Sequence, residues 1–254
     1  MKIGYLITCE HASNKIPSKY KSLFAPHTKL LETHRGWDIG AYQCYQEIIK
    51  AIPCQSQYAR WSRLLIELNR SLHHRSLFSE ITQTLDADER NKIIHDIYVP
   101  YREAIHQKIK QLLSKHDRII HISVHSFTPK MNHEVRNAEV GLLYDPKRPY
   151  ERDFCFRLKH HIKCENKNLR VRMNYPYLGS SDGLTTALRK IYAEKSYIGL
   201  ELELNQKLML DKNKQHAFIQ NIVHALQKTI HIVTADEFSS RRRASSNRNV
   251  HKST

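Results

Sequence analysis

The sequence predicts a single α/β domain built on a largely parallel or mixed sheet. Short apolar runs typical of buried strands alternate along the chain with amphipathic stretches of helical length, the pattern that favours parallel pairing. No internal repeat and no linker interrupts residues 1–235. A chain of 254 residues with 26% charged and 40% hydrophobic residues is ordinary for one large globular domain.

The elements follow from hydrophobic periodicity. The predicted strands cover residues 2–9, 55–60, 118–124, 140–144, 169–173 and 197–204. The predicted helices cover residues 40–51, 86–114, 150–164, 183–193 and 213–230. Acidic residues gather just after Thr84 and favour a helix start at Asp86. Pro100 lies near the middle of that long helix and is expected to kink or break it.

Location is predicted from the cysteines and from the first residues. The five cysteines are scattered without a CxxC pair, which favours reduced thiols and a cytoplasmic protein over a disulfide scaffold or a zinc ribbon. Glu10 and His11 follow the first apolar run before a secretory signal could form, so we interpret this run as a buried strand. No uncharged apolar run approaches the roughly 18 residues of a membrane span.

The net charge of +16 leaves a second function class open. Five of the basic residues lie in the last 14 positions without an acid, so residues 236–254 are predicted to form a basic, disordered tail. A basic surface attracts nucleic acid or anionic substrates. A nucleic-acid-binding protein is therefore the rival prediction, although no helix-turn-helix, zinc-finger or RNP-type signature is present.

Histidines and carboxylates follow several predicted strands. His11 comes after the first strand, His125 after the third, and Glu201 and Glu203 lie within the last. Asp38 precedes a helix in a block that holds two of only seven glycines. Because ligands gather beyond the carboxyl ends of strands, these side chains fit a zinc site of two His and one carboxylate, with a further Glu as general base.

Each of these residues also has a purely structural interpretation. A histidine at a strand end is commonly a hydrogen-bonded structural residue, and Asp38 could cap the helix that begins near Gly40. Glu201 and Glu203 share one face of their strand by period two, which on an edge strand would be solvated. On a buried strand they would need a partner or a metal.

A further cluster runs from Ser62 to Arg70. Arginine binds carboxylates through two parallel hydrogen bonds, and a neighbouring asparagine amide can add a third. The same residues could equally form a surface network of ion pairs.

Together, these blocks resemble the N-formylglutamate amidohydrolase family. The matching blocks occur in one order over most of residues 9–206: Glu10-His11-Ala12-Ser13-Asn14 with Ile16-Pro17, His34 with Trp37-Asp38-Ile39-Gly40-Ala41, Ser62-Arg63-Leu64 with Asn69-Arg70, His125-Ser126-Phe127-Thr128-Pro129, Arg136 before Gly141-Leu142, Asn174-Tyr175-Pro176-Tyr177, and Glu201. The family looks like a distant branch of the zinc carboxypeptidase and aspartoacylase group. The resemblance implies a phosphorylase/hydrolase-like three-layer sandwich with a mixed central sheet.

The resemblance also implies a site. It assigns zinc to His11 and His125, the substrate carboxylate to Asn69 and Arg70, and activation of water to Glu201. The wider group takes its second ligand from a Glu three residues after the first His, where this chain has Asn14. Asp38 is the expected substitute, with Glu10 as the competing ligand.

Other side chains complete the expected machinery. Arg63 or Arg136 is expected to steady the oxyanion or a second carboxylate, and Ser126 is assigned to substrate binding. Family members often have Asp where this chain has Glu67. The implied function is hydrolysis of an N-formyl or N-acyl amino acid by a zinc-activated water. A zinc amidase or peptidase of other specificity remains the alternative enzyme.

Overall fold

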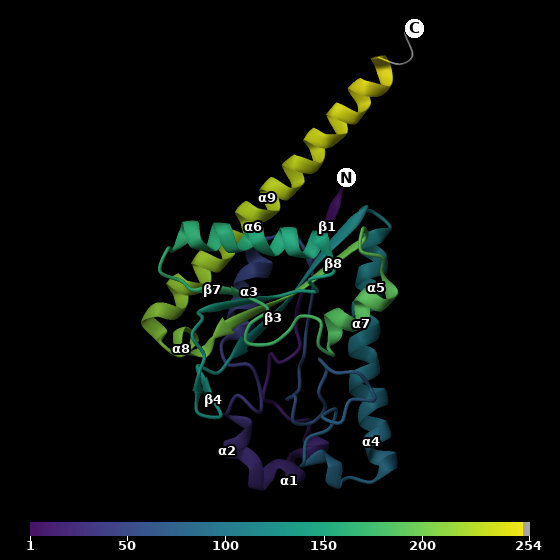
Figure 1. Cartoon of the computed structure of the whole chain (residues 1–254). Helices are drawn as coiled ribbons and strands as arrows, with labels where there is room; N and C mark the ends of the chain where they lie inside the picture. Colours follow the sequence, from purple (N-terminus) through teal and green to yellow (C-terminus); the bar gives the residue numbers. More distant parts are fainter. Residues whose placement is uncertain (251–254) are drawn as a thin grey trace.

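The centre of the fold is a six-stranded sheet in the strand order β2-β1-β3-β8-β6-β7 (Figure 1). Its strands are β1 (Ile3–Cys9), β2 (Gln55–Tyr58), β3 (Arg118–Phe127), β6 (Val140–Leu143), β7 (Val171–Met173) and β8 (Tyr197–Asn205). Strands β2, β1, β3 and β8 are parallel, whereas β6 pairs antiparallel to β8 and parallel to β7. All six predicted strands are therefore present, and the mixed sheet is confirmed. This computed structural model describes the backbone of residues 1–250 and the side chains of residues 1–233.

Helices cover both faces of the sheet and give three layers (Figure 1). One face packs against α3 (Ala41–Ala51), α6 (Pro149–Glu165) and α9 (Lys212–Val250). The other packs against α5 (Val99–Leu113) and α7 (Leu184–Ile191), and α4 (Ala87–Ile93) adds Ile93 to the same core cluster. The predicted basic tail at residues 236–254 lies outside the residues with described side chains and stays a prediction.

The two faces of the central strands differ in polarity. On β3 and β8 the even-numbered residues are aliphatic from Ile120 to Val124 and from Ile198 to Leu204, and they enter the core beneath α3, α6 and α9. The odd-numbered residues on the opposite face include His125, Glu201 and Glu203. The prediction that the two glutamates share one face of their strand is confirmed. Because β8 lies between β3 and β6, it is a central strand and not an edge strand.

The long predicted helix begins and bends where the sequence indicates. The Asp86 side chain accepts a hydrogen bond from the Glu89 backbone N–H at 2.7 Å and so caps α4. Pro100 lies in the first turn of α5, directly after a π-helical turn over Ile94–Tyr98. Because proline lacks an N–H, the regular hydrogen-bond ladder cannot run through this point, and the π turn accommodates the break.

Several short elements were not predicted. They are the helices α1 (Lys21–Phe24), α2 (Thr28–Leu31) and α8 (Gln206–Met209), 3-10 turns over Ser18–Tyr20, Ala25–His27 and Thr82–Thr84, and a hairpin of β4 (Lys130–Met131) and β5 (Glu134–Val135). Elements of two to four residues are too short to show a period. Within the described residues no helix has the length and apolarity to cross a bilayer. All five cysteines are free.

A buried ion pair joins α6, α7 and β8. Glu151 is fully buried, and its carboxylate accepts hydrogen bonds from Arg189 Nε at 2.9 and 3.1 Å. The Glu151 carboxylate also accepts the Gly199 N–H, and Arg189 donates to the Gly199 and Gly179 carbonyls. This pair therefore fixes the loop before α7 against the sheet.

We expect Glu151→Gln to lower the free energy of unfolding by about 3 kcal/mol, because it leaves the Arg189 guanidinium buried without a counter-charge. Urea unfolding measures this loss. Glu47→Gln is the matched control, since its partner Lys50 is exposed and the pair should contribute less than about 1 kcal/mol. Equal losses in the two variants would contradict this account of the buried pair.

Candidate metal centre and active site

Three potential metal ligands converge at the carboxyl ends of β1 and β3: His11 follows β1, and His125 lies near the end of β3. The Nδ1 atoms of His11 and His125 lie 3.2 Å apart. The Oδ2 atom of Asp38 lies 3.2 Å from the first and 2.9 Å from the second. All three side chains are buried. These are the three residues proposed as ligands from the sequence.

The other ring nitrogen of each histidine faces a buried carboxylate. His11 Nε2 lies 2.5 Å from Glu67 Oε1, and His125 Nε2 lies 3.1 Å from Glu10 Oε2. When Nδ1 of each ring binds a metal, Nε2 carries the N–H: that of His11 then faces Glu67, and that of His125 faces Glu10 and the nearer Ser123 hydroxyl at 2.8 Å. Carboxylates placed behind metal-binding histidines in this way fix the ring and raise its basicity.

The geometry and charge fit a divalent cation. Ligand atoms at 2.0–2.1 Å around a tetrahedral zinc ion lie about 3.3 Å from one another, close to the three separations found here. Glu10, Asp38 and Glu67 bring three negative charges and Arg63 one positive charge, which is an excess of two negative charges when both imidazoles are neutral, the form that binds a metal. A divalent cation would balance that excess, and two imidazoles with a carboxylate suit zinc.

The pKa values in the cluster are shifted by the charges that the carboxylates and imidazoles exert on one another. Burial opposes ionisation of Asp38, but the charges and hydrogen bonds of His11 and His125 outweigh it and hold the Asp38 pKa well below its usual value. Burial is likewise outweighed at Glu10, where His125 lowers the pKa to about 2. The pKa of His125 is raised well above its ordinary value by Asp38 and Glu10 despite its burial.

The Asp38 side chain enters the cluster and does not cap α3. Gly40 precedes α3 with a φ of 85°, and no side chain caps that helix. The alternative that Asp38 caps α3 is therefore not what the structure contains. Its Oδ2 instead accepts the Ser126 N–H at 3.2 Å, and its Oδ1 lies 3.3 Å from Arg63 Nη1.

Glu10, the competing ligand, lies behind His125. Its Oε2 accepts a short hydrogen bond from Ser123 Oγ, and its Oε1 accepts one from Tyr101 at 3.0 Å. The sequence singled out this carboxylate but could not show which side of the imidazole it occupies.

Arg63 also contacts Glu67, to which its Nε donates at 2.8 Å. Arg63 therefore bonds both the proposed ligand Asp38 and the Glu67 carboxylate, which lies behind the His11 ring, and it orients both groups. Its side chain is 28% exposed and lines the adjoining cavity, so part of the guanidinium also faces the space where substrate would bind.

The two glutamates of β8 lie at different depths. Glu203 pairs in register with His125, and Glu201 pairs with Ser123 one step farther back. Glu203 is buried and its Oε2 has no hydrogen-bond partner among the described residues. Burial raises its pKa to about 7, against the influence of His125. Glu201 is half-buried and accepts a hydrogen bond from Thr185 at 2.8 Å.

Gly141 on β6 leaves room beside Glu203. The two residues are register partners, and a Cβ on Gly141 would collide with the Tyr175 carbonyl oxygen and lie 3.2 Å from the Glu203 Cβ. Glycine at this position therefore allows the loop after β7 to approach β6 closely.

Asn69 and Arg70, the pair predicted to bind the substrate carboxylate, lie in different environments. Asn69 is buried, with Oδ1 accepting the Leu184 N–H at 2.7 Å and Nδ2 lying 3.4 Å from His125 Nε2. Arg70 lines the cavity, and its Nη1 donates to the backbone carbonyls of Asn69 and Asp182. Arg70 is thus the member of the pair that a substrate can reach.

The two other residues predicted to contact substrate, Ser126 and Arg136, differ in how accessible they are. The Ser126 hydroxyl donates to the Ile39 carbonyl and accepts from Gln206 Nε2, so its side chain is engaged within the protein. Arg136 lies at the rim, where it bonds the Tyr177 hydroxyl at 3.2 Å and stacks on its ring.

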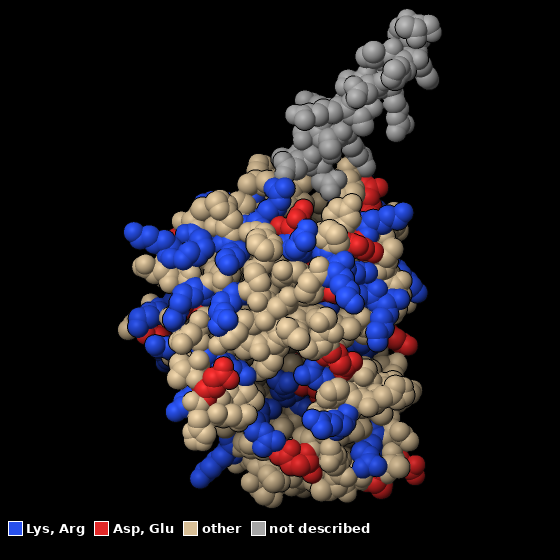
Figure 2. Space-filling view, viewed as in Figure 1, with Lys and Arg blue, Asp and Glu red and all other residues tan. Residues whose placement is uncertain are grey.

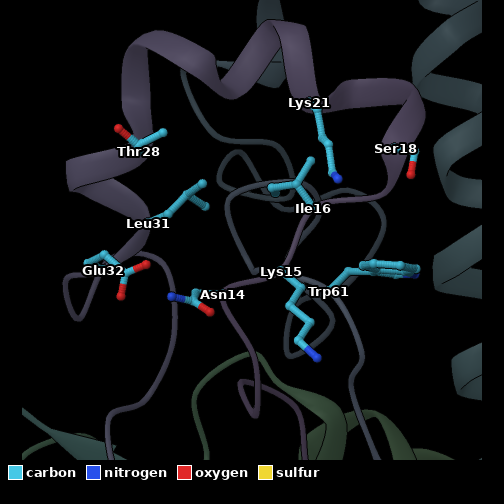
Figure 3. Close-up of a pocket in the computed structure, with 9 residues that line it drawn as sticks. All are labelled: Asn14, Lys15, Ile16, Ser18, Lys21, Thr28, Leu31, Glu32 and Trp61. Carbon is cyan, nitrogen blue, oxygen red and sulfur yellow. The ribbon is translucent and has the colours of Figure 1, made fainter.

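A cavity of about 600 Å³ adjoins the cluster. Arg63, Glu67, Arg70 and Tyr177 are among its lining residues. Figure 2 shows a hollow bordered by Lys and Arg side chains in the lower half of the face, where Figure 1 places the loops between the sheet and helices α1, α2 and α4. A separate hollow of about 520 Å³ lies beside α1 and α2, and Figure 3 shows Lys21 and Trp61 among its lining residues. It contains none of the proposed ligands.

A buried polar chain continues from the cluster along the same sheet face. Thr8 Oγ1 lies 2.8 Å from His121 Nε2, and the Tyr197 hydroxyl lies 2.7 Å from His121 Nδ1. Burial lowers the pKa of His121 to about 4. This histidine therefore stays neutral in the folded protein at neutral pH.

The comparisons with known proteins identify the family of this chain. The model of the N-formylglutamate amidohydrolase family matches residues 3–210. The chain belongs to this family. The match covers the strands and loops that carry His11, Asp38, His125 and Glu203. Hydrolysis of amides is the chemistry of the N-formylglutamate amidohydrolase family.

Solved structures share the fold. The gene product Atu2144 of Agrobacterium tumefaciens superimposes with a TM-score of 0.76 at 25% identity, over 91% of each chain. An N-formylglutamate amidohydrolase of Ralstonia eutropha JMP134 superimposes with a TM-score of 0.64 at 15% identity, over 92% of this chain and 95% of that one. A comparison with curated proteins returned no match.

The neutral His121 should make stability depend on pH. As the pH falls below about 6.5 the unfolded chain protonates this histidine, whereas the folded chain does so only near pH 4. The free energy of unfolding should therefore drop by about 2 kcal/mol from pH 7 to pH 5 through this group. Urea unfolding of wild type and His121→Gln at equal zinc concentration should show a shallower pH slope in the variant. Identical slopes would contradict the depressed pKa.

Proposed function

We propose that this chain is a zinc-dependent amidohydrolase that cleaves the amide of an N-formyl or N-acyl amino acid. The observation that carries the proposal is the convergence of His11 Nδ1, His125 Nδ1 and Asp38 Oδ2, each imidazole being held from behind by a carboxylate. Membership of an amide-hydrolysing family supports the reaction class. Zinc as the resident ion and the N-acyl substrate are the proposed elements.

The chemistry divides between the ion and the protein. A zinc ion bound by these three ligands would polarise the amide carbonyl and lower the pKa of water. Glu67 and Glu10 lie behind the two imidazole rings and would leave their Nδ1 atoms free to hold the ion. The Arg63 guanidinium holds Asp38 in place and can also face negative charge that develops on the carbonyl oxygen.

We assign proton transfer to Glu203. This residue pairs with His125 in the sheet, its Oε2 has no hydrogen-bond partner among the described residues, and a pKa near 7 suits a group that takes a proton from water and returns it to the leaving amine. Glu201, which the resemblance points to, accepts a hydrogen bond from Thr185 and remains the alternative base. Parity alone cannot separate the two, since both side chains lie on one face.

Substrate binding is assigned to Arg70, with Arg136 at the rim. A guanidinium at the cavity wall binds a carboxylate through two hydrogen bonds, so a carboxylate-bearing amine would be held beside the metal centre. Asn69 steadies this wall, because its Oδ1 accepts the Leu184 N–H at the start of α7. A nucleic-acid partner remains the rival proposal, since residues 236–254 hold five basic and two acidic residues and most of the net charge of +16 lies in residues 1–235. Five free thiols suit a reducing compartment such as the cytoplasm.

The two glutamates can be distinguished by paired variants. Glu203→Gln should lower kcat by at least about 100-fold while zinc content stays near one ion per chain, because only the proton acceptor is removed. Glu201→Gln should keep most of the turnover. Steady-state hydrolysis of N-formyl-glutamate with metal analysis of each variant makes the test. The reverse order of losses would assign the proton transfer to Glu201, and loss of zinc from Glu203→Gln would show that it acts through the metal instead.

Glu67 should matter for metal affinity without binding the ion. Glu67→Gln removes the charge behind His11 and should weaken zinc binding about 10- to 100-fold in competition with a chromogenic chelator. Glu80→Gln is a matched control, because it also removes a carboxylate paired with an arginine on the cavity wall. Unchanged affinity in Glu67→Gln would contradict the role given to this carboxylate.

A further inference from the structure

The cavity beside the metal centre carries more positive charge than the proposed reaction uses. Four arginines and two histidines line it: Arg35, Arg63, Arg70, Arg75, His34 and His74. Only two acidic residues, Glu67 and Glu80, do so. Hydrolysis of a single N-acyl amino acid would use Arg63 and Arg70, which leaves the outer part of this lining without a role.

The outer arginines differ in how they are neutralised. Arg35 makes two hydrogen bonds to Glu80 at 2.7 and 2.8 Å, so its charge is balanced within the wall. Arg70 bonds only backbone carbonyls, and Arg75 has no carboxylate partner among the described residues. Two uncompensated guanidinium groups therefore face one cavity, and Arg136 adds a third at its rim.

The cavity is also larger than a single small substrate requires. A volume of about 600 Å³ lies in the range that encloses drug-sized ligands, well above one formylated amino acid. Phe78, Met131 and Tyr177 supply apolar wall between the charged groups. Such a wall suits the methylene groups of an acidic side chain, whose carboxylate would then reach an arginine.

We propose that the substrate is an N-acylated acidic peptide of at least two residues, with one carboxylate at Arg70 and a second at Arg75. The inference rests on the proposed function, because it places the scissile amide at the metal centre and the peptide in the outer cavity. Guanidinium groups favour carboxylates through paired hydrogen bonds, which a lysine-lined wall would not offer. Burial and the charges of Arg63 and Arg35 lower the pKa of His34, as expected for a site with surplus positive charge.

The test compares substrates that differ by one charge. The zinc-loaded full chain is assayed with N-formyl-Glu and with the C-terminal amides of N-formyl-Glu-Glu and N-formyl-Glu-Gln, so that the first peptide carries two carboxylates and the second only one. We expect kcat/KM to be about tenfold higher for the Glu-Glu peptide than for the Glu-Gln peptide. Arg75→Gln should remove that preference and leave N-formyl-Glu hydrolysis unchanged. Arg152→Gln, an exposed arginine on α6, is the control. Equal kcat/KM for the two peptides, or a preference that survives in Arg75→Gln, would overturn the inference.

A binding measurement separates this inference from the proposed function. Titration calorimetry with Glu-Glu-Glu should show binding to the wild type that is about tenfold weaker in Arg75→Gln. Arginine-dependent binding without hydrolysis of any of the three formyl compounds would remove the hydrolase proposal and keep the acidic ligand. Hydrolysis of N-formyl-Glu without any effect of Arg75 would do the opposite.

Discussion

The structure depends on three carboxylates buried at one end of a sheet. Glu10, Asp38 and Glu67 lie around two imidazoles with a single guanidinium to offset them. Burying such charge is unfavourable unless it is paired, and removing a charge from water costs several kcal/mol per ion. A divalent cation at the two Nδ1 atoms and Asp38 Oδ2 would resolve this excess. The arrangement is therefore best explained as a metal centre with its supporting carboxylates.

The sheet makes this concentration of charge possible. Parallel pairing of β1, β3 and β8 places the last residues of each strand side by side, and alternation sends the aliphatic residues to the opposite face. The fold thus keeps an apolar core beneath α3, α6 and α9. Its polar face continues through Thr8, His121 and Tyr197, each satisfied by a neighbour. The antiparallel strand β6 then brings Gly141 beside Glu203.

The sequence predicted the architecture well because long periodic segments determine it. All six strands of the sheet and the Asp86 helix start could be identified from alternation and capping. Residues 18–31, the β4–β5 hairpin and α8 could not, since their elements span too few residues to show a period. Strand ends and the family resemblance pointed to His11, Asp38 and His125. They could not reveal that Glu67, 56 residues from His11 in sequence, lies behind its ring. Nor could parity distinguish Glu203 from Glu201, because the difference depends on register with His125.

The two histidines are expected to bind the ion through Nδ1, because their Nε2 atoms face Glu67 and Glu10. A crystal structure of the zinc-loaded chain, with anomalous diffraction at the zinc edge, tests this most directly. We predict one ion at 2.0–2.2 Å from His11 Nδ1, His125 Nδ1 and Asp38 Oδ2, with both glutamates still bonded to Nε2. An ion bound through Nε2, or one bound by Glu10 in place of Asp38, would contradict the account.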